Sequence, residues 1–131
     1  MVRGVGIDVV DAAEQERLLG AFPERVFARI FTECELADAR GRRDRAGVLA
    51  GRFGVKEAVF KVVAPLLPEK SFDLRIVATA TAADGTPRLE IAAALRESLD
   101  RAEVDEVLVS TSRQGDLVVA LAVAERRTAG Q

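Results

Sequence analysis

Two acidic residues and one lysine, held in two short motifs, carry most of the chemistry available to this chain. Asp8 closes the motif Gly6-Ile7-Asp8, and Glu57 and Lys61 lie one helical turn apart in a motif that runs from Arg52 to Lys61. Carboxylate oxygens bind hard cations such as Mg²⁺, and a lysine binds phosphate as a point charge. The two motifs therefore indicate a site for a metal ion and a phosphorylated ligand.

The composition restricts the chain to carboxylate, lysine and arginine chemistry. It has no histidine, tryptophan or tyrosine and only one cysteine, Cys34. The absence of histidine excludes Ser-His-Asp and Cys-His catalysis and the usual zinc sites. A single cysteine has no partner for a disulfide within the chain. The net charge of -2 argues against a general nucleic-acid binder.

The length of 131 residues, with 49% hydrophobic and 31% charged residues, predicts a single folded domain over residues 1–125 and a disordered tail over 126–131. No apolar run approaches the roughly 20 residues that span a bilayer. Asp8 and Asp11 interrupt the only apolar stretch near the N-terminus, so no signal peptide is expected. We therefore expect a cytoplasmic protein with no membrane contact, and its small size favours an oligomer.

Hydrophobic periodicity predicts an α+β fold, in which a mostly antiparallel sheet packs around one long central helix. Helices are expected over residues 12–21, 24–30, from a capping box at Thr32 and Glu35, over 46–64 and over 92–101. Strands are expected over residues 2–10, 72–82, 88–91, 106–111 and 116–125. Pro65 and Pro68 end the central helix.

The first strand and the central helix must position the two acidic residues. Alternation along the strand places Asp8 on one face with Gly4 and Gly6, which indicates a face cleared for the close approach of a ligand. In the helix, Glu57 is expected near the middle of an apolar stripe. A carboxylate there needs a partner, because burying an unpaired charge costs several kcal/mol.

Simpler structural explanations exist for each of these residues. Asp8 could cap a helix at the end of its strand, and Glu57 could form an i,i+4 ion pair with Lys61. Arg52 and Lys56, one turn apart beside the same face, either contact phosphate or extend to solvent. Seven basic residues against two acidic ones between residues 40 and 61 suit an anionic ligand or an acidic protein, or a solvated loop.

These motifs together resemble the signature of the 4'-phosphopantetheinyl transferases. The chain is similar to the holo-acyl-carrier-protein synthase branch in its short length and in two further motifs, and the likeness covers residues 2–125. The further motifs are Arg29-Ile30-Phe31-Thr32 with Glu35-Leu36, and Asp84-Gly85-Thr86-Pro87.

The resemblance implies transfer of the phosphopantetheine arm of coenzyme A to a serine of an apo acyl carrier protein, or of a polyketide or peptide carrier domain, with release of adenosine 3',5'-bisphosphate. Asp8 and Glu57 would bind Mg²⁺ against the pyrophosphate, and Lys61 would bind the phosphates. Glu57, or water on the metal, would be the base for the serine proton. The implied catalytic residues are Glu57 and Lys61, and the coenzyme A contacts are Arg52, Lys56, Lys61 and Arg113. The family also implies a homotrimer with active sites at subunit interfaces.

The chain departs from the family pattern at three places. Arg113 stands where the family has a histidine, and Val62-Val63-Ala64-Pro65 replaces a glycine-containing loop. The first helix, which presents arginines to the carrier protein in the family, has Arg17 alone among acidic residues, so docking falls to Arg25, Arg29 or the loop over 40–45. The leading interpretation is an active transferase. The alternative is a non-catalytic paralogue that binds coenzyme A or a carrier protein.

Overall fold

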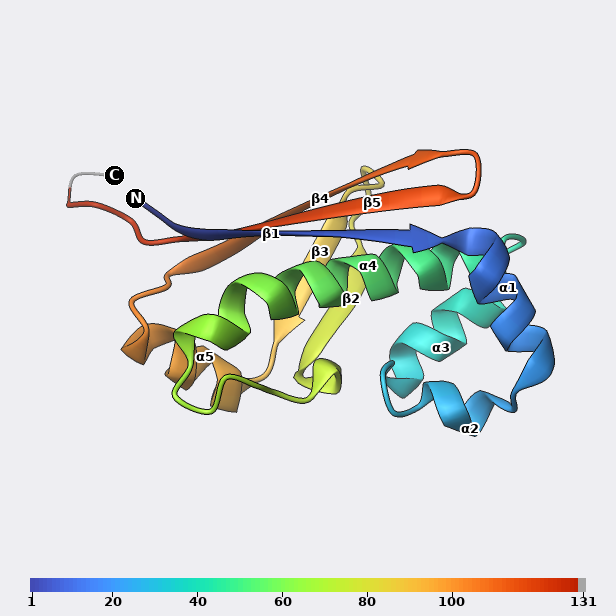
Figure 1. Ribbon diagram of the computed structural model, residues 1–131, viewed down its shortest axis with the longest axis horizontal. Coiled ribbons are helices and arrows are strands. Elements are labelled where there is room, and N and C mark those ends of the chain that lie inside the picture. The colour runs from blue at the N-terminus through green and yellow to red at the C-terminus, as the bar shows by residue number, and fades with distance from the viewer. Residues whose placement is uncertain (130–131) are drawn as a thin grey trace.

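A helix of 19 residues, α4 (Arg45–Val63), runs through the centre of the computed structural model, which describes residues 1–129 (Figure 1). Strands β1 (Val2–Asp11), β5 (Leu117–Glu125) and β4 (Glu106–Gln114) form an antiparallel sheet in the order β1-β5-β4. Strands β2 (Val77–Thr81) and β3 (Pro87–Ile91) form a separate antiparallel hairpin. The predicted α+β class is confirmed, with two small sheets in place of one.

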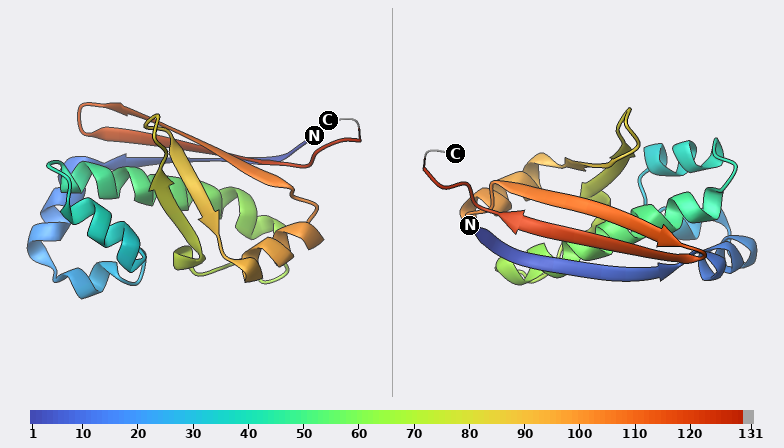
Figure 2. Two further views of the ribbon diagram at one scale, coloured as in Figure 1. Left: turned by 180° about the vertical axis from the view of Figure 1, so that it is seen from behind. Right: turned by 90° about the horizontal axis from the view of Figure 1, so that it is seen from above.

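The remaining helices gather at the two ends of α4. In Figure 1 three of them lie near its N-terminal end, and α5 lies beneath its C-terminal half. These helices are α1 (Ala12–Ala21), α2 (Glu24–Phe27), α3 (Glu33–Arg40) and α5 (Ala93–Arg101), with single 3₁₀ turns at Ala64–Leu66 and Leu74–Ile76. The arrangement leaves the sheet on one side of α4 and the hairpin on another (Figure 2).

Small residues let α4 pack directly against the sheet. A Cβ atom placed on Gly6 would lie 2.1 Å from the carbonyl oxygen of Ala58, and Gly54 lies against Ala120 of β5. Three buried alanines of β5 complete this contact: Ala120, Ala122 and Ala124. The interpretation that Gly4 and Gly6 clear the strand for a ligand is therefore wrong, because the backbone that approaches this face is that of the helix.

The predicted boundaries hold for most elements. Thr32 and Glu35 form the predicted capping box, and Asp11, rather than Asp8, caps α1. The expected strand over 72–82 begins only at Val77, because Asp73 caps a 3₁₀ turn ahead of it. The helix expected over 24–30 ends at Phe27. The strand expected over 106–111 extends to Gln114.

The predicted tail is partly held by hydrogen bonds. The Arg126 backbone N–H donates to the Met1 carbonyl over 2.9 Å, and the Arg127 N–H donates to Asp105 Oδ2 over 2.6 Å. Residues 130–131, the end of that predicted tail, lie outside the described part of the chain.

None of the helices in residues 1–129 covers the outer face of the three-stranded sheet (Figures 1 and 2), which is mainly apolar along β1 and β5 and carries Ser110, Ser112 and Gln114 on β4. Because side chains alternate along a strand, the residues opposite the α4 contact all point to this face. The exposed large hydrophobic residues on these strands are Val2, Val5, Ile7, Val9, Leu108, Leu117 and Leu121. Elsewhere, none of the helices in residues 1–129 combines the length and hydropathy needed to span a membrane.

Candidate functional site

Strand β1 and helix α4 bring Asp8, Glu57 and Lys61 to one place. The Lys61 ammonium donates to Asp8 Oδ1 over 2.8 Å and to the Ile7 carbonyl over 2.9 Å. The side chain of Asp8 is 15% exposed and that of Lys61 is 50% exposed. The lysine therefore bonds to the strand, and the alternative of an i,i+4 ion pair with Glu57 is not the arrangement in the fold.

Glu57 lies half-buried beside this pair, with its carboxylate free of hydrogen bonds and ion pairs in residues 1–129. Burial raises the pKa of Glu57, the charge of Asp8 raises it further, and the charge of Lys61 lowers it in part. The prediction that Glu57 sits within the buried stripe of α4 is wrong, since it stands at the margin of that stripe. The fully buried charge of this helix is Lys56.

The donor set of this cluster fits a magnesium ion. It offers two carboxylates on separate elements, and burial and then the charge of Asp8 raise the pKa of Glu57, as expected for a carboxylate that a nearby cation would stabilise. The Lys61 ammonium already binds one of the two. No group of three or more acidic, histidine or cysteine side chains suited to a metal occurs in the described chain. Magnesium commonly takes one or two carboxylates and completes its shell with substrate phosphate and water.

Lys56 leaves α4 in a different direction from Glu57, because consecutive helical residues are 100° apart. Its ammonium is 2.7 Å from Glu35 Oε1 and donates to the Leu74 carbonyl over 3.0 Å. The side chains of Lys56 and Glu35 are both 0% exposed. Burial lowers the pKa of Lys56, and the hydrogen bond to Glu35 offsets part of this change. The structure thus does not bring Lys56 to the Asp8 cluster.

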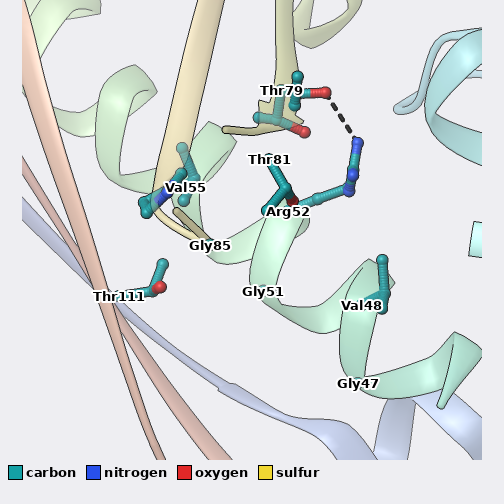
Figure 3. A pocket seen from close by; sticks show the side chains of 11 residues that line it. Gly47, Val48, Gly51, Arg52, Val55, Thr79, Thr81, Gly85 and Thr111 are labelled. Carbon is teal, nitrogen blue, oxygen red and sulfur yellow. Dashed lines mark hydrogen bonds between the residues drawn. The ribbon is translucent and has the colours of Figure 1, made fainter. Parts of the chain in front are cut away.

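Arg52 lines a pocket between α4 and the β2-β3 hairpin (Figure 3). Its guanidinium donates to the Thr79 carbonyl over 2.8 Å and to Asp38 Oδ2. The pocket has a volume of about 150 Å³. Its lining comes from α4, β2, the turn before β3, and β4: Gly47, Val48, Gly51, Arg52, Val55, Thr79, Ala80, Thr81, Gly85, Pro87 and Thr111. Two residues of the Asp84-Gly85-Thr86-Pro87 motif therefore belong to this pocket.

Arg113 lies beside Gly47, one of the residues that line this pocket. Its Nη1 donates to Asp44 Oδ2 over 2.6 Å and its Nε to the Gly115 carbonyl over 2.9 Å. Asp44 also caps α4 by accepting the Gly47 N–H, and both hydrogen bonds, that from Arg113 first, lower the pKa of Asp44. A Cβ on Gly47 would lie 2.2 Å from Arg113 Nη1, so only glycine leaves room for this contact.

Sequence reasoning missed the roles of Glu35, Asp38 and Thr79 around this pocket. The capping box identified Glu35 only as a helix start, although the carboxylate also accepts hydrogen bonds from Thr79, 44 residues away. The sequence offered one signal for these roles. Glu35 and Lys56 carry opposite charges in two different motifs, and neither has an obvious partner within its own motif.

The long helix thus packs against an antiparallel sheet, and the two elements bring together a carboxylate pair and a lysine. The chain belongs to the 4'-phosphopantetheinyl transferase superfamily, whose family model matches residues 4–122.

Within that superfamily, the chain is similar to proteins named holo-[acyl-carrier-protein] synthase. One from Anaeromyxobacter dehalogenans (strain 2CP-C) is 33% identical over 95% of this chain and 97% of its own length. One from Paramagnetospirillum magneticum (strain ATCC 700264 / AMB-1) is 33% identical over 98% of this chain and 100% of its own.

Solved structures show the same relationship. The holo-[acyl-carrier-protein] synthase from Neisseria meningitidis superposes with a TM-score of 0.84 at 29% identity, covering 96% of this chain and 100% of that chain. A holo-(acyl-carrier-protein) synthase from Bacillus anthracis str. Ames, solved in complex with CoA (3',5'-ADP), has a TM-score of 0.75 at 26% identity, covering 97% and 99%. The predicted family and fold are confirmed.

Proposed function

We propose that this protein is a holo-[acyl-carrier-protein] synthase. It transfers the 4'-phosphopantetheine arm of coenzyme A to a serine of an apo acyl carrier protein and releases adenosine 3',5'-bisphosphate. The observation that carries this proposal is the grouping of Asp8, Glu57 and Lys61 between β1 and α4. Nearly full-length relatives of that name support it.

Asp8 and Glu57 are the residues that would hold Mg²⁺. When bound, the ion neutralises charge that develops on the pyrophosphate of coenzyme A as the phosphorus-oxygen bond breaks. The pair supplies only carboxylate oxygens, as a hard cation requires. A raised pKa of Glu57 supports this assignment, because it marks a carboxylate whose negative charge lacks a compensating partner.

Lys61 and Glu57 perform the remaining steps. The Lys61 ammonium bonds to Asp8 and is therefore close to phosphates that Mg²⁺ on Asp8 and Glu57 would bind. There it offsets charge on the leaving bisphosphate. The Glu57 carboxylate accepts the proton of the serine hydroxyl as the serine oxygen attacks phosphorus in line with the leaving oxygen.

The Arg52 pocket is proposed to take the nucleotide end of coenzyme A. Arg52 supplies a buried cation at one wall, and Arg113 supplies a second cation beside Gly47, which lines the pocket. Only two of the five N–H donors of Arg113 have partners in the described residues, so it can contact a phosphate without leaving Asp44. We therefore assign Arg113 a binding role, because an arginine cannot act as a base.

We further propose a homotrimer that packs through the outer face of the three-stranded sheet. Apolar side chains such as Val5, Ile7 and Val9 cover this face, and contiguous exposed apolar patches mark interaction surfaces. Light scattering should give three times the mass of the chain. A monomeric mass would contradict this part of the proposal and leave the transfer reaction untouched.

The decisive experiment mixes the purified protein with coenzyme A, Mg²⁺ and a panel of apo carrier proteins from fatty acid, polyketide and peptide synthesis. The intact mass of each carrier reports the added phosphopantetheine, and a parallel sample contains EDTA. Modification that EDTA abolishes is the expected result. Coenzyme A binding with no modification of any carrier would instead identify a non-catalytic paralogue.

A further inference from the structure

One set of sequence motifs takes no part in the proposed chemistry and meets in the protein interior. The Thr32–Glu35 capping box of α3 supplies Glu35, and α4 supplies Lys56, both with side chains 0% exposed. Glu35 Oε1 accepts the Thr32 N–H over 2.8 Å and the Lys56 ammonium over 2.7 Å. The Lys56 ammonium also lies 5.8 Å above the centre of the Phe31 ring. This pair is thus a buried salt bridge with its hydrogen-bonding groups engaged.

The other carboxylate oxygen of Glu35 reaches the ligand pocket. It accepts the Thr79 backbone N–H over 3.0 Å and a hydrogen bond from the Thr79 hydroxyl. The Thr79 carbonyl accepts from Arg52 over 2.8 Å. Both backbone groups of Thr79 on the open edge of β2 are therefore bound by charged side chains from α3 and α4, where a sheet would have another strand.

We infer that Glu35 and Lys56 are positioning residues for the pocket between α4 and β2. They fix Thr79, which lines that pocket together with Arg52, at a set distance and orientation from α4 (Figure 3). The inference rests on the proposed function, in that the pocket receives the nucleotide end of coenzyme A. Lys56 thereby acts on the ligand without touching it.

The direction of the effect follows from hydrogen-bond chemistry. An ionised Glu35 accepts from four donors: the Thr32 N–H, the Lys56 ammonium, and the N–H and hydroxyl of Thr79. In Glu35→Gln, one of the two oxygens becomes an NH₂ donor, so at least one buried donor faces another donor. Lys56→Met removes the counter-charge and leaves a buried carboxylate uncompensated. Either change weakens the hold of Glu35 on the Thr79 N–H and hydroxyl, while Arg52 still binds the Thr79 carbonyl.

The test compares these variants with a control that destabilises the fold elsewhere. Leu99→Ala truncates a fully buried residue of α5 that does not line the pocket. Calorimetry gives the Kd of adenosine 3',5'-bisphosphate for each protein, and urea unfolding gives its stability. We expect a rise in Kd of about tenfold or more for Glu35→Gln and Lys56→Met. We expect less than about a twofold change for Leu99→Ala at a comparable loss of stability, because distant sites act independently.

Steady-state transfer adds a second readout. The KM for coenzyme A should rise in Glu35→Gln while kcat stays within about twofold, because Asp8, Glu57 and Lys61 keep their contacts. Kd and KM values equal to those of the wild type in folded variants would overturn the inference and show that the pair only stabilises the fold. Failure of the wild-type protein to bind the bisphosphate would instead overturn the proposed use of the pocket.

A milder pair of variants covers the case in which the first two do not fold. Thr79→Ser keeps the hydroxyl that donates to Glu35, and Thr79→Val removes it while keeping the branched shape. Thr79→Ser should retain the wild-type Kd, and Thr79→Val should raise it severalfold. Equal Kd values for the two variants would contradict a positioning role for this hydrogen bond.

Discussion

Lys56 and Glu57 are consecutive residues of α4, yet their surroundings are opposite in character. Lys56 lies in a dry interior, with its ammonium on Glu35 and on the Leu74 carbonyl. Glu57 lies half-exposed beside Asp8, with no hydrogen bond to its carboxylate in the described residues and with a raised pKa. One helix thus carries a lysine with hydrogen-bond partners on one side and, on another, a carboxylate without a hydrogen-bond partner in the described residues.

The difference shows how a small fold separates stability from function. A buried charge is tolerated only when each of its hydrogen-bonding groups has a partner, and the Glu35–Lys56 pair meets that condition. A carboxylate that lacks a partner costs free energy in the unliganded protein but remains available to a metal ion or a proton. The account therefore predicts that changes near Asp8 alter chemistry, and changes near Glu35 alter the fold and the pocket.

The largest effect is expected for Asp8→Asn. Loss of one of the two carboxylates that are proposed to bind Mg²⁺ should lower kcat/KM for carrier modification by about 10³-fold with little loss of stability. Asp11→Asn is the matched control, because an asparagine caps α1 as well as the aspartate does. The intact-mass assay under saturating Mg²⁺ measures both. A rate near that of the wild type in Asp8→Asn would contradict the expectation that changes near Asp8 alter the chemistry.

Lys56→Met tests the other side of the helix. Removing one member of a buried pair should lower the free energy of unfolding by about 3–5 kcal/mol. Lys61→Met should lower it by less, because the Lys61 side chain is 50% exposed whereas that of Lys56 is 0% exposed. Urea unfolding monitored by circular dichroism compares the two. Equal losses would show that burial does not distinguish these lysines.

Lys61→Met should have a large effect on catalysis, although its effect on stability is the smaller of the two. Removing the ammonium that is proposed to bind the phosphates should reduce kcat/KM for coenzyme A by about 100-fold. Lys70→Met is a suitable control, since Lys70 is exposed and its ammonium bonds only to the Pro65 carbonyl in the described chain. A Lys61→Met enzyme that retains its KM and kcat would remove this residue from the site.

The smallest effect is a pH-dependent gain in stability for Glu57→Gln. The pKa of Glu57 in the folded protein is raised above the reference value of 4.5, so ionising this carboxylate destabilises the fold. The variant in EDTA should therefore melt at a slightly higher Tm than the wild type at pH 7.5. The gain should shrink as the pH falls through the raised pKa and vanish below about 4.5. A gain that persists at pH 4 would show another cause.

Much of the fold and the acidic cluster could be predicted from the sequence, because local patterns determine them. The alternation along β1 and the helical spacing of Glu57 and Lys61 placed these residues correctly on their elements. The burial of Glu57 was predicted wrongly, because a helix that is apolar on several sides leaves its exposed margin ambiguous. Gly6 was predicted to leave space for a ligand, because the sequence does not reveal that the Ala58 backbone approaches it.

The pocket and the buried pair lay beyond sequence reasoning for a different reason. Lys56 and Glu35 meet only because α3 packs on α4, and Thr79 joins them from β2. Such contacts depend on how whole elements are arranged in space, which periodicity along one element does not encode. Arg113 illustrates the same point, because its partner Asp44 lies 69 residues away.

The most direct test of the account is the transfer rate of Glu57→Gln beside that of the wild type, with Mg²⁺, coenzyme A and an apo carrier protein in excess. The account predicts that the mass of the carrier stays unmodified for at least about 100 times longer with the variant. It also predicts that the variant is no less stable than the wild type. Transfer at the wild-type rate by a folded Glu57→Gln protein would contradict the assignment of this site.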